Sequence, residues 1–282
     1  MLRYTHDTVP SQFVEAGGVR YAYRRFGEPN GTPLVFFQHF MGNLDDHDSA
    51  LTDAFAQERE VILFNNAGVA SSGGRTPDTI EQMARDAGTF IHAVGLTVID
   101  ILAHSMGGLV GQQVALDRPE LVRKLILVGT APRGGQGLGA MPPETEALFF
   151  ETYDRQEDMW LPILFSPSKE SQAAGRSYVE RITARLDRDA PVAPEAVQAQ
   201  AAAIGTWGAR MDDTYGYLAG LKQPTLVVNG NNDIIVPTVN SYLLQQHAPN
   251  AQLILYPDAN HGAHHQYPEL FVKHAKLFLD SE

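Results

Sequence analysis

Six short apolar runs recur along the chain, and helical segments lie between several of them. Their apolar character is nearly continuous, which is typical of strands that are covered on both faces. At residues 80–94 and 109–116, apolar side chains return every three or four positions, which predicts helices. The runs span residues 34–37, 61–64, 98–102, 125–128, 225–228 and 253–256. This alternation predicts an α/β fold with a central parallel sheet and right-handed crossovers.

The N-terminal segment follows a different pattern. Residues 12–15 and 19–24 alternate between apolar and polar side chains on either side of Gly17 and Gly18. Such alternation indicates a hairpin with one face in water. We therefore expect an antiparallel edge on the mostly parallel sheet.

The middle of the chain interrupts the alternation of strand and helix. Residues 132–223 contain no β-branched run, and Ala- and Gln-rich stretches lie there among prolines. This composition predicts several short helices. We predict residues 1–132 as the first part of the α/β core, residues 133–222 as a helical cap, and residues 223–282 as the second part of the core.

Composition excludes several classes of function. The chain has no Cys, which removes disulfides, thiolate nucleophiles and cysteine-ligated metal centres. Its net charge of −12, without a run of Lys and Arg, argues against nucleic acid as a partner. No leader pattern begins the sequence, and no run approaches the roughly 20 apolar residues of a membrane span. A cytoplasmic monomer or homodimer is expected.

One serine lies where the third apolar run meets a helical segment. Directly after residues 98–102 comes the segment Ala103-His104-Ser105-Met106-Gly107-Gly108. A strand, a sharp turn that carries Ser, and a helix together form a nucleophile elbow. A Ser hydroxyl is a weak nucleophile unless it is held beside a base, at the positive end of a helix. Ser105 is therefore the predicted nucleophile, and a helix start without chemistry is the competing explanation.

An acid and a base follow this serine at the ends of later strands, in the order Ser, acid, His that is expected for a nucleophile elbow on a parallel sheet. Asp233 lies in the loop after residues 225–228, and His261 lies in the loop after residues 253–256. We predict that Asp233 orients the ring of His261 and that His261 is the general base. Rival candidates stay open, and they are the acid Asp258 and the bases His264 and His265.

Acyl transfer also needs two backbone N–H groups that stabilise the negative oxygen of the tetrahedral intermediate. Met106, which follows the predicted nucleophile, supplies one of them. The second should come from the loop after the first parallel strand, Gln38-His39-Phe40-Met41-Gly42-Asn43. The register of this loop favours the amide of Phe40, so that His39 is expected to be a structural loop residue.

These motifs resemble those of the α/β-hydrolase superfamily, in its branch of small bacterial serine esterases, lactonases and cofactor-free haloperoxidases or perhydrolases. The resemblance covers nearly the whole chain, including the helical cap. It rests on the oxyanion loop at 38–42, the elbow at 103–108, the acid loop at 230–237 and the histidine loop at 260–262. The chain departs from the usual motifs at Gln38, His39, Asn65, Ala103 and Asn260.

The resemblance implies that Ser105 cleaves a small or medium apolar carboxylic ester or lactone by acyl transfer. It implies no metal and no organic cofactor. Two alternatives stay open: a haloperoxidase or perhydrolase that uses the same three residues with peroxide, and a ligand-binding protein on this fold with little turnover. A haloalkane dehalogenase is disfavoured because it would need Asp at position 105.

The predicted cap and the oxyanion loop carry candidate pocket residues. We expect an apolar substrate pocket that is bordered by His39, Phe149, Trp160, Phe165 and Trp207. For most of the aromatic residues, packing of the cap against the core is the competing explanation.

An acidic segment, Asp45-Asp46-His47-Asp48, has the ligand types that a divalent ion prefers. A solvated helix start with Asp near its N-terminus explains the segment better. No metal site is therefore predicted there.

Overall fold

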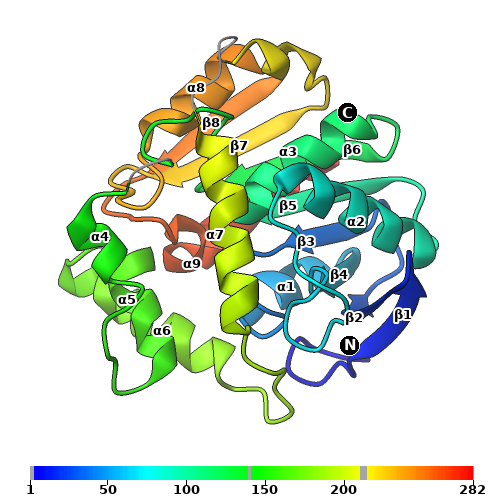
Figure 1. Cartoon of the computed structure of the whole chain (residues 1–282), viewed down its shortest axis with the longest axis horizontal. Helices are drawn as coiled ribbons and strands as arrows, with labels where there is room; N and C mark the ends of the chain where they lie inside the picture. Colours follow the sequence, from blue (N-terminus) through cyan, green and yellow to red (C-terminus); the bar gives the residue numbers. More distant parts are fainter. Residues whose placement is uncertain (1–2, 139–140, 210–214, 282) are drawn as a thin grey trace.

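The computed structural model of the chain describes residues 3–138, 141–209 and 215–281, and a single eight-stranded sheet forms its centre (Figure 1). The order of the strands in the sheet is β1-β2-β4-β3-β5-β6-β7-β8. The strands are β1 (Gln12–Ala16), β2 (Val19–Gly27), β3 (Leu34–Phe37), β4 (Glu60–Phe64), β5 (Ile99–His104), β6 (Val122–Val128), β7 (Thr225–Gly230) and β8 (Ala251–Tyr256). Strands β3 to β8 pair in parallel, whereas β2 is antiparallel to both β1 and β4. The predicted parallel sheet with an antiparallel N-terminal edge is confirmed.

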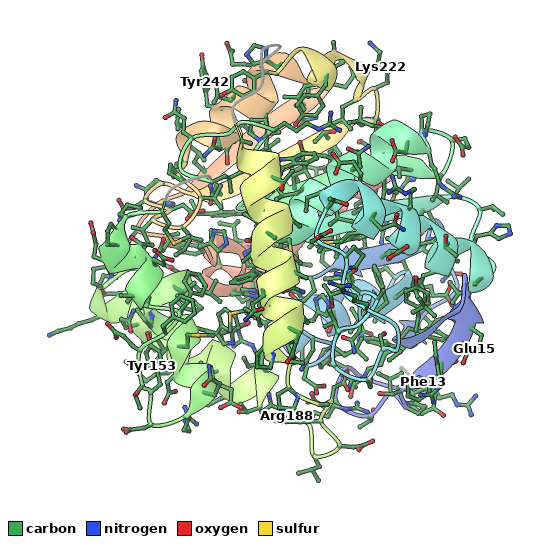
Figure 2. All side chains as sticks on the ribbon, viewed as in Figure 1. Phe13, Glu15, Tyr153, Arg188, Lys222 and Tyr242 are labelled. Atoms are coloured by element: carbon green, nitrogen blue, oxygen red, sulfur yellow. The ribbon has the colours of Figure 1, made fainter. Side chains whose placement is uncertain are left out.

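The N-terminal hairpin has one solvated face, as predicted. Phe13 and Glu15 are exposed on β1 and point outwards at the edge of the molecule (Figure 2). Val14 and Ala16, on the opposite face of the same strand, pack against the core. Because successive side chains of a strand point to opposite faces, the alternating sequence gives one wet face and one dry face.

Helices cover both faces of the sheet, and this explains the continuous apolar runs. On one face lie α2 (Ile80–Ala93), α3 (Met106–Asp117) and α8 (Val239–His247), and on the other lie α1 (Ser49–Ala56), α9 (Ala263–Gln266) and α10 (Pro268–Asp280). Val35 and Phe37 of β3 belong to the first core, whereas Leu34 and Phe36 belong to the second. Side chains on both faces of a central strand are therefore mostly apolar.

The last strand differs from the prediction of a strand covered on both sides. Strand β8 lies at the edge of the sheet and pairs with β7 on one side. Its residue Leu255 is 45% exposed. An apolar run indicates a strand, but it does not show whether that strand pairs with neighbours on both sides or lies at the edge of the sheet.

The described residues between β6 and β7 form helices and no strand. These helices are α4 (Pro143–Ala147), η1 (Gln156–Met159), α5 (Trp160–Leu164), α6 (Lys169–Ile182), α7 (Pro194–Gly208) and η2 (Gly216–Gly220). Figure 1 shows α4, α5 and α6 together at one side of the molecule, with α7 as a long helix beside them. Ile163 and Tyr178 from this segment share a third apolar core with Ile235 and Val236. The helical content agrees with the sequence, and the division into core and cap stays a prediction.

Side chains cap several of the helices. Asp48 accepts a hydrogen bond from the Ala50 N–H at the start of α1, and Thr79 accepts from the Gln82 N–H at the start of α2. Such caps satisfy N–H groups that have no acceptor within the helix. None of the described helices combines the length and the apolar character that crossing a bilayer demands.

Candidate active site

Ser105 lies in the turn between β5 and α3, with backbone angles of φ 55° and ψ −121°. This conformation is unfavourable for a residue with a side chain, so surrounding contacts must hold it. The Ser105 N–H donates to the Val128 carbonyl (2.9 Å), and the Ser105 carbonyl accepts from the Thr130 hydroxyl (2.8 Å). The turn places the Ser105 hydroxyl at the carboxyl end of the sheet, beside the N-terminus of α3.

Small residues allow this turn to approach the neighbouring elements. A Cβ at Gly107 would lie 2.3 Å from the Phe37 carbonyl oxygen. Ala103 stands where the family motif usually has Gly, and its side chain faces Gly111, where an added Cβ would lie 3.2 Å away. The extra methyl group of Ala103 therefore fits because Gly111 has no side chain.

We expect Gly107→Ala to lower the unfolding free energy by about 1–3 kcal/mol or more, because the new Cβ meets backbone atoms of β3 and the loop that follows it. Gly205→Ala in α7 is the matched control, since its Cβ meets nothing within 4 Å. It should be neutral or stabilising, because Ala favours a helix more than Gly does. Urea unfolding measures both variants, and equal stability would contradict the close approach at Gly107.

A chain of hydrogen bonds joins the three side chains that the sequence selected. The Oγ of Ser105 lies 2.8 Å from Nε2 of His261, and Nδ1 of the same ring lies 2.8 Å from Oδ2 of Asp233. The other carboxylate oxygen of Asp233 accepts from the N–H groups of Ile235 and Val236, both at 2.9 Å. Because a carboxylate only accepts, Nδ1 carries the proton, and Nε2 can accept from the Ser105 hydroxyl.

The rival candidates lie elsewhere. Asp258 is exposed and accepts from the Ser168 hydroxyl at 2.6 Å. His264 and His265 lie on α9, where their rings pack against His104. Within the described part of the chain, neither of these two histidines is hydrogen-bonded to the predicted nucleophile. The structure therefore brings together Ser105, Asp233 and His261, and none of the rival candidates.

Phe40 and Met106, whose amides are the two predicted backbone donors, line the same cavity. In the loop after β3, the amides on either side of Phe40 donate to the side chains of Gln38 (2.8 Å) and Gln200 (3.0 Å). The Phe40 N–H has no acceptor among the described residues. Met106 is the first residue of α3, and N–H groups in a first helical turn have no acceptor within the helix. Both amides are thus available to a ligand oxygen.

A cavity of about 530 Å³ is lined by Ser105, His261 and apolar side chains. Three of the five predicted pocket residues line it, namely His39, Phe149 and Trp160. The His39 ring packs edge-on against Trp160, with the ring centroids 4.7 Å apart. The loop after β3 and the helical segment thus meet at the wall of the cavity.

Phe165 and Trp207 are not among the residues that line this cavity, so their assignment to the pocket is wrong. Phe165 packs against Tyr178, with the ring centroids 5.7 Å apart. The indole N–H of Trp207 points to the Ala131 carbonyl (3.4 Å), and its ring packs edge-on against Tyr217. Both rings are buried in packing between elements, and helical spacing alone does not distinguish such a position from a cavity wall.

The acidic segment before α1 is buried, so the prediction of a solvated helix start is wrong in this respect. Asp45 pairs with Arg24 at 2.6 Å, and Asp48 pairs with Arg181 at 2.6 Å while it caps α1. The helix start itself is where the sequence predicted it. The sequence could not reveal the burial, because both arginines come from distant segments and meet the carboxylates only in the folded chain.

Asp46 is expected to make stability depend on pH. Its carboxylate accepts from the Asn43 N–H at 2.8 Å, and burial raises its pKa to about 7. In the unfolded chain, the pKa of an Asp side chain is about 3.9. Between about pH 4 and about pH 7 the folded chain keeps a proton that the unfolded chain loses, so the unfolding free energy falls as pH rises. Asp46→Asn should remove this fall, so that its advantage over wild type grows from near zero at about pH 4 to on the order of a few kcal/mol at about pH 7.

Urea unfolding of wild type and Asp46→Asn at a series of pH values tests this expectation. The Asn side chain can still accept from the Asn43 N–H, so the comparison isolates the charge. Parallel pH profiles for the two proteins would contradict the assignment to Asp46.

Two supporting residues escaped the sequence analysis. Thr130 holds the Ser105 carbonyl, and Gln200 of α7 holds the Met41 amide beside Phe40. Thr130 comes two residues after β6, and a polar residue at the end of the strand beside the elbow is a signal that could have indicated it. Gln200 lies in an Ala- and Gln-rich helix without a local signal of this kind.

The whole chain is similar to solved structures. An alpha/beta hydrolase fold protein from Chitinophaga pinensis matches with a TM-score of 0.93 and 40% identity, over 99% of this chain and 100% of that chain. A structure described as Est816, an N-acyl homoserine lactone degrading enzyme, matches with a TM-score of 0.75 and 26% identity, over 95% of this chain and 100% of that chain.

Sequence comparisons agree with this similarity. A family model described as alpha/beta hydrolase fold matches residues 32–268. A pimeloyl-[acyl-carrier protein] methyl ester esterase from Nitrosomonas europaea is 31% identical over 175 residues, which are 60% of this chain and 66% of that protein. A poly(3-hydroxyalkanoate) depolymerase from Ectopseudomonas oleovorans is 29% identical over 253 residues, which are 84% of this chain and 80% of that protein. The family match includes the positions of Ser105, Asp233 and His261.

Proposed function

The chain belongs to the alpha/beta hydrolase family, and from this premise we propose that it is a serine hydrolase that cleaves a neutral carboxylic ester or lactone through an acyl-enzyme on Ser105. One observation carries the proposal. The Ser105 hydroxyl is hydrogen-bonded to His261, which is hydrogen-bonded to Asp233, and this chain of contacts ends in the wall of an apolar cavity.

The first half of the reaction forms the acyl-enzyme. The Oγ of Ser105 attacks the carbonyl carbon of the substrate while its proton passes to Nε2 of His261. The carbonyl oxygen becomes negative, and the N–H groups of Phe40 and Met106 stabilise it. The bond to the alcohol then breaks, and the departing oxygen takes the proton from His261.

The second half regenerates the enzyme. A water molecule gives a proton to His261 and attacks the acyl carbon, after which the acid leaves and Ser105 regains its proton. Asp233 keeps the proton of the ring on Nδ1 and stabilises the positive charge that His261 carries in each half. With a lactone, the alcohol remains attached to the acyl chain, and the product is a hydroxy acid.

The cavity supports a neutral, apolar acyl group. The described residues that line it include no Lys or Arg, and the charged one among them is Glu146, which is exposed. Burying an unpaired polar group against apolar walls costs on the order of 2–7 kcal/mol of free energy. An unpaired carboxylate costs more, because it is charged. Leu138, Met141 and Phe149 contribute to the walls from the helical segment, which supports its assignment as a cap at residues 133–222.

The named activities of the relatives support the same reaction class. The Nitrosomonas europaea relative is a methyl ester esterase, and Est816 degrades a lactone. Esters and lactones share the carbonyl and the alkoxide leaving group on which the proposed mechanism depends.

We expect 4-nitrophenyl hexanoate to be hydrolysed with a kcat/KM at least about tenfold above that of the mono-4-nitrophenyl ester of adipic acid. The two acyl chains have the same length and differ in a terminal carboxylate, which would meet no Lys or Arg among the described residues of the cavity wall. Release of 4-nitrophenolate measures both reactions. Equal rates would contradict the neutral acyl chain, and no turnover of esters or lactones of any length would contradict the hydrolase itself.

A further inference from the structure

Three histidine rings gather beneath the candidate active site. His104 ends β5, directly before Ser105, and His264 and His265 lie on α9, shortly after His261. Each ring contributes one nitrogen to a set of three atoms that all lie within 4.8 Å of one another. All three side chains are buried, with at most 4% exposed.

The cluster contains polar atoms without protein partners. Nδ1 of His104, Nδ1 of His264 and Nε2 of His265 are buried and have no hydrogen-bond partner among the described residues. Buried polar atoms in native proteins nearly always have a partner, so three such nitrogens in one cluster point to a partner outside the protein, either water or an ion. The same rings line a cavity of about 10 Å³, which holds about one water-sized sphere.

Outer contacts orient two of the rings. Nδ1 of His265 lies 3.3 Å from the carboxylate of Asp48, which Arg181 also contacts. Nε2 of His104 lies 3.1 Å from the His261 carbonyl oxygen. Each ring donates its N–H to these oxygens and keeps a lone pair on the other nitrogen. A carboxylate or a carbonyl behind the ring is the usual support of a histidine that binds a metal.

We propose that His104, His264 and His265 form a binding site for one divalent transition-metal ion of the Zn²⁺ class, with water at the fourth position. Imidazole nitrogen suits this class of ion, and three histidines with water complete a tetrahedral shell. With Zn–N bonds of about 2.0–2.1 Å in a tetrahedral shell, the three nitrogens would lie roughly 3.4 Å apart, so the rings would move closer together when the ion binds. This site departs from the expectation of no metal, which rested on the family resemblance and on residues 45–48.

The ion would have a structural role. It would join the end of β5, which positions Ser105, to α9, which follows the loop of His261. It would thus link the two segments whose separation decides whether nucleophile and base can contact each other. The site lies outside the proposed acyl-transfer machinery and does not depend on the proposed reaction.

Metal titration of the folded protein tests the proposal. Protein treated with a chelator and then dialysed is titrated with Zn²⁺ and with Co²⁺, and bound metal, the visible spectrum and the melting temperature are recorded. We expect one ion per chain, the visible absorption of tetrahedral Co²⁺, and a higher melting temperature with Zn²⁺. If neither Zn²⁺ nor Co²⁺ binds at about one ion per chain, the proposal is wrong.

His264→Leu separates a metal site from a buried polar cluster that holds only water. His264 makes no hydrogen bond among the described residues, so without a metal its replacement by an apolar side chain should raise the melting temperature. With a metal, the variant should lose Zn²⁺ affinity by more than about 100-fold and no longer respond to Zn²⁺. His274→Leu on α10 is the control, since this histidine contacts Tyr256 outside the cluster, and it should bind Zn²⁺ like wild type.

Asp48→Asn adds a milder test, because Asn can still cap α1 but no longer supports His265 as a carboxylate does. We expect a loss of Zn²⁺ affinity of about 10–100-fold. Equal Zn²⁺ affinity in wild type and His264→Leu would overturn the assignment of the ligands. Because these measurements do not use ester turnover, their failure would leave the proposed hydrolase function unchanged.

Discussion

Ser105→Ala is expected to lose labelling by a fluorophosphonate probe and to lower kcat for ester hydrolysis by about 10⁶-fold. The probe and the substrate both require a nucleophilic oxygen beside a base, and the Oγ of Ser105 lies 2.8 Å from Nε2 of His261. Removing this oxygen leaves only the stabilisation of the transition state by binding and by the backbone N–H groups. Gel fluorescence measures the labelling, and single-turnover kinetics measures the residual rate.

The fold should survive this change, because the Ser105 hydroxyl contacts His261 while the backbone of the turn is held by Val128 and Thr130. Ser166→Ala is the matched control. Ser166 is buried like Ser105, its hydroxyl has no partner among the described residues, and it lies outside the lining of the cavity. This control should be labelled like wild type, and persistent labelling of Ser105→Ala would refute the assignment of the nucleophile.

Asp233→Asn is expected to lower kcat by about 10⁴-fold while the protein stays folded. The Asn oxygen can still accept from the N–H groups of Ile235 and Val236. Its NH₂ group then faces His261 and acts as a donor, so the ring must turn its proton to Nε2. In that tautomer His261 cannot accept the proton of Ser105, and catalysis loses its base.

The comparison with Asp258→Asn tests which acid serves the histidine. Asp258 is exposed and contacts the Ser168 hydroxyl, so its replacement should leave kcat unchanged. Circular dichroism and urea unfolding verify that both variants fold. A large loss in Asp258→Asn with a small loss in Asp233→Asn would reverse the two roles.

The sheet could be predicted from the sequence because its signals are local. A strand between two layers of helices needs apolar side chains on both faces, and the runs at β3 and β5 show this directly. The alternation in the N-terminal hairpin indicates one wet face for the same reason. Strand β8 shows the limit of this reasoning, since its edge position depends on strand order, which no single run records.

The same distinction applies to the candidate site. Ser105, Asp233 and His261 each follow a strand, and the carboxyl ends of parallel strands meet at one edge of a sheet. Their positions after strands therefore indicated all three, whereas the rivals Asp258 and His264 stayed open until the hydrogen bonds of the folded chain were known. The pocket was harder to predict, because Phe165 and Trp207 have the same apolar character as the aromatic residues that do line the cavity.

By itself, the sequence determined the layered α/β architecture, the turn at Ser105 and the loops that carry Asp233 and His261, since each depends on neighbours along the chain. Only the tertiary structure decided the burial of Asp45 and Asp48 by distant arginines, the edge position of β8 and the gathering of His104 with the histidines of α9. The physical reason is that burial, charge pairing and clustering are set by contacts between residues far apart in sequence. Such contacts leave no periodic pattern that a single chain could display.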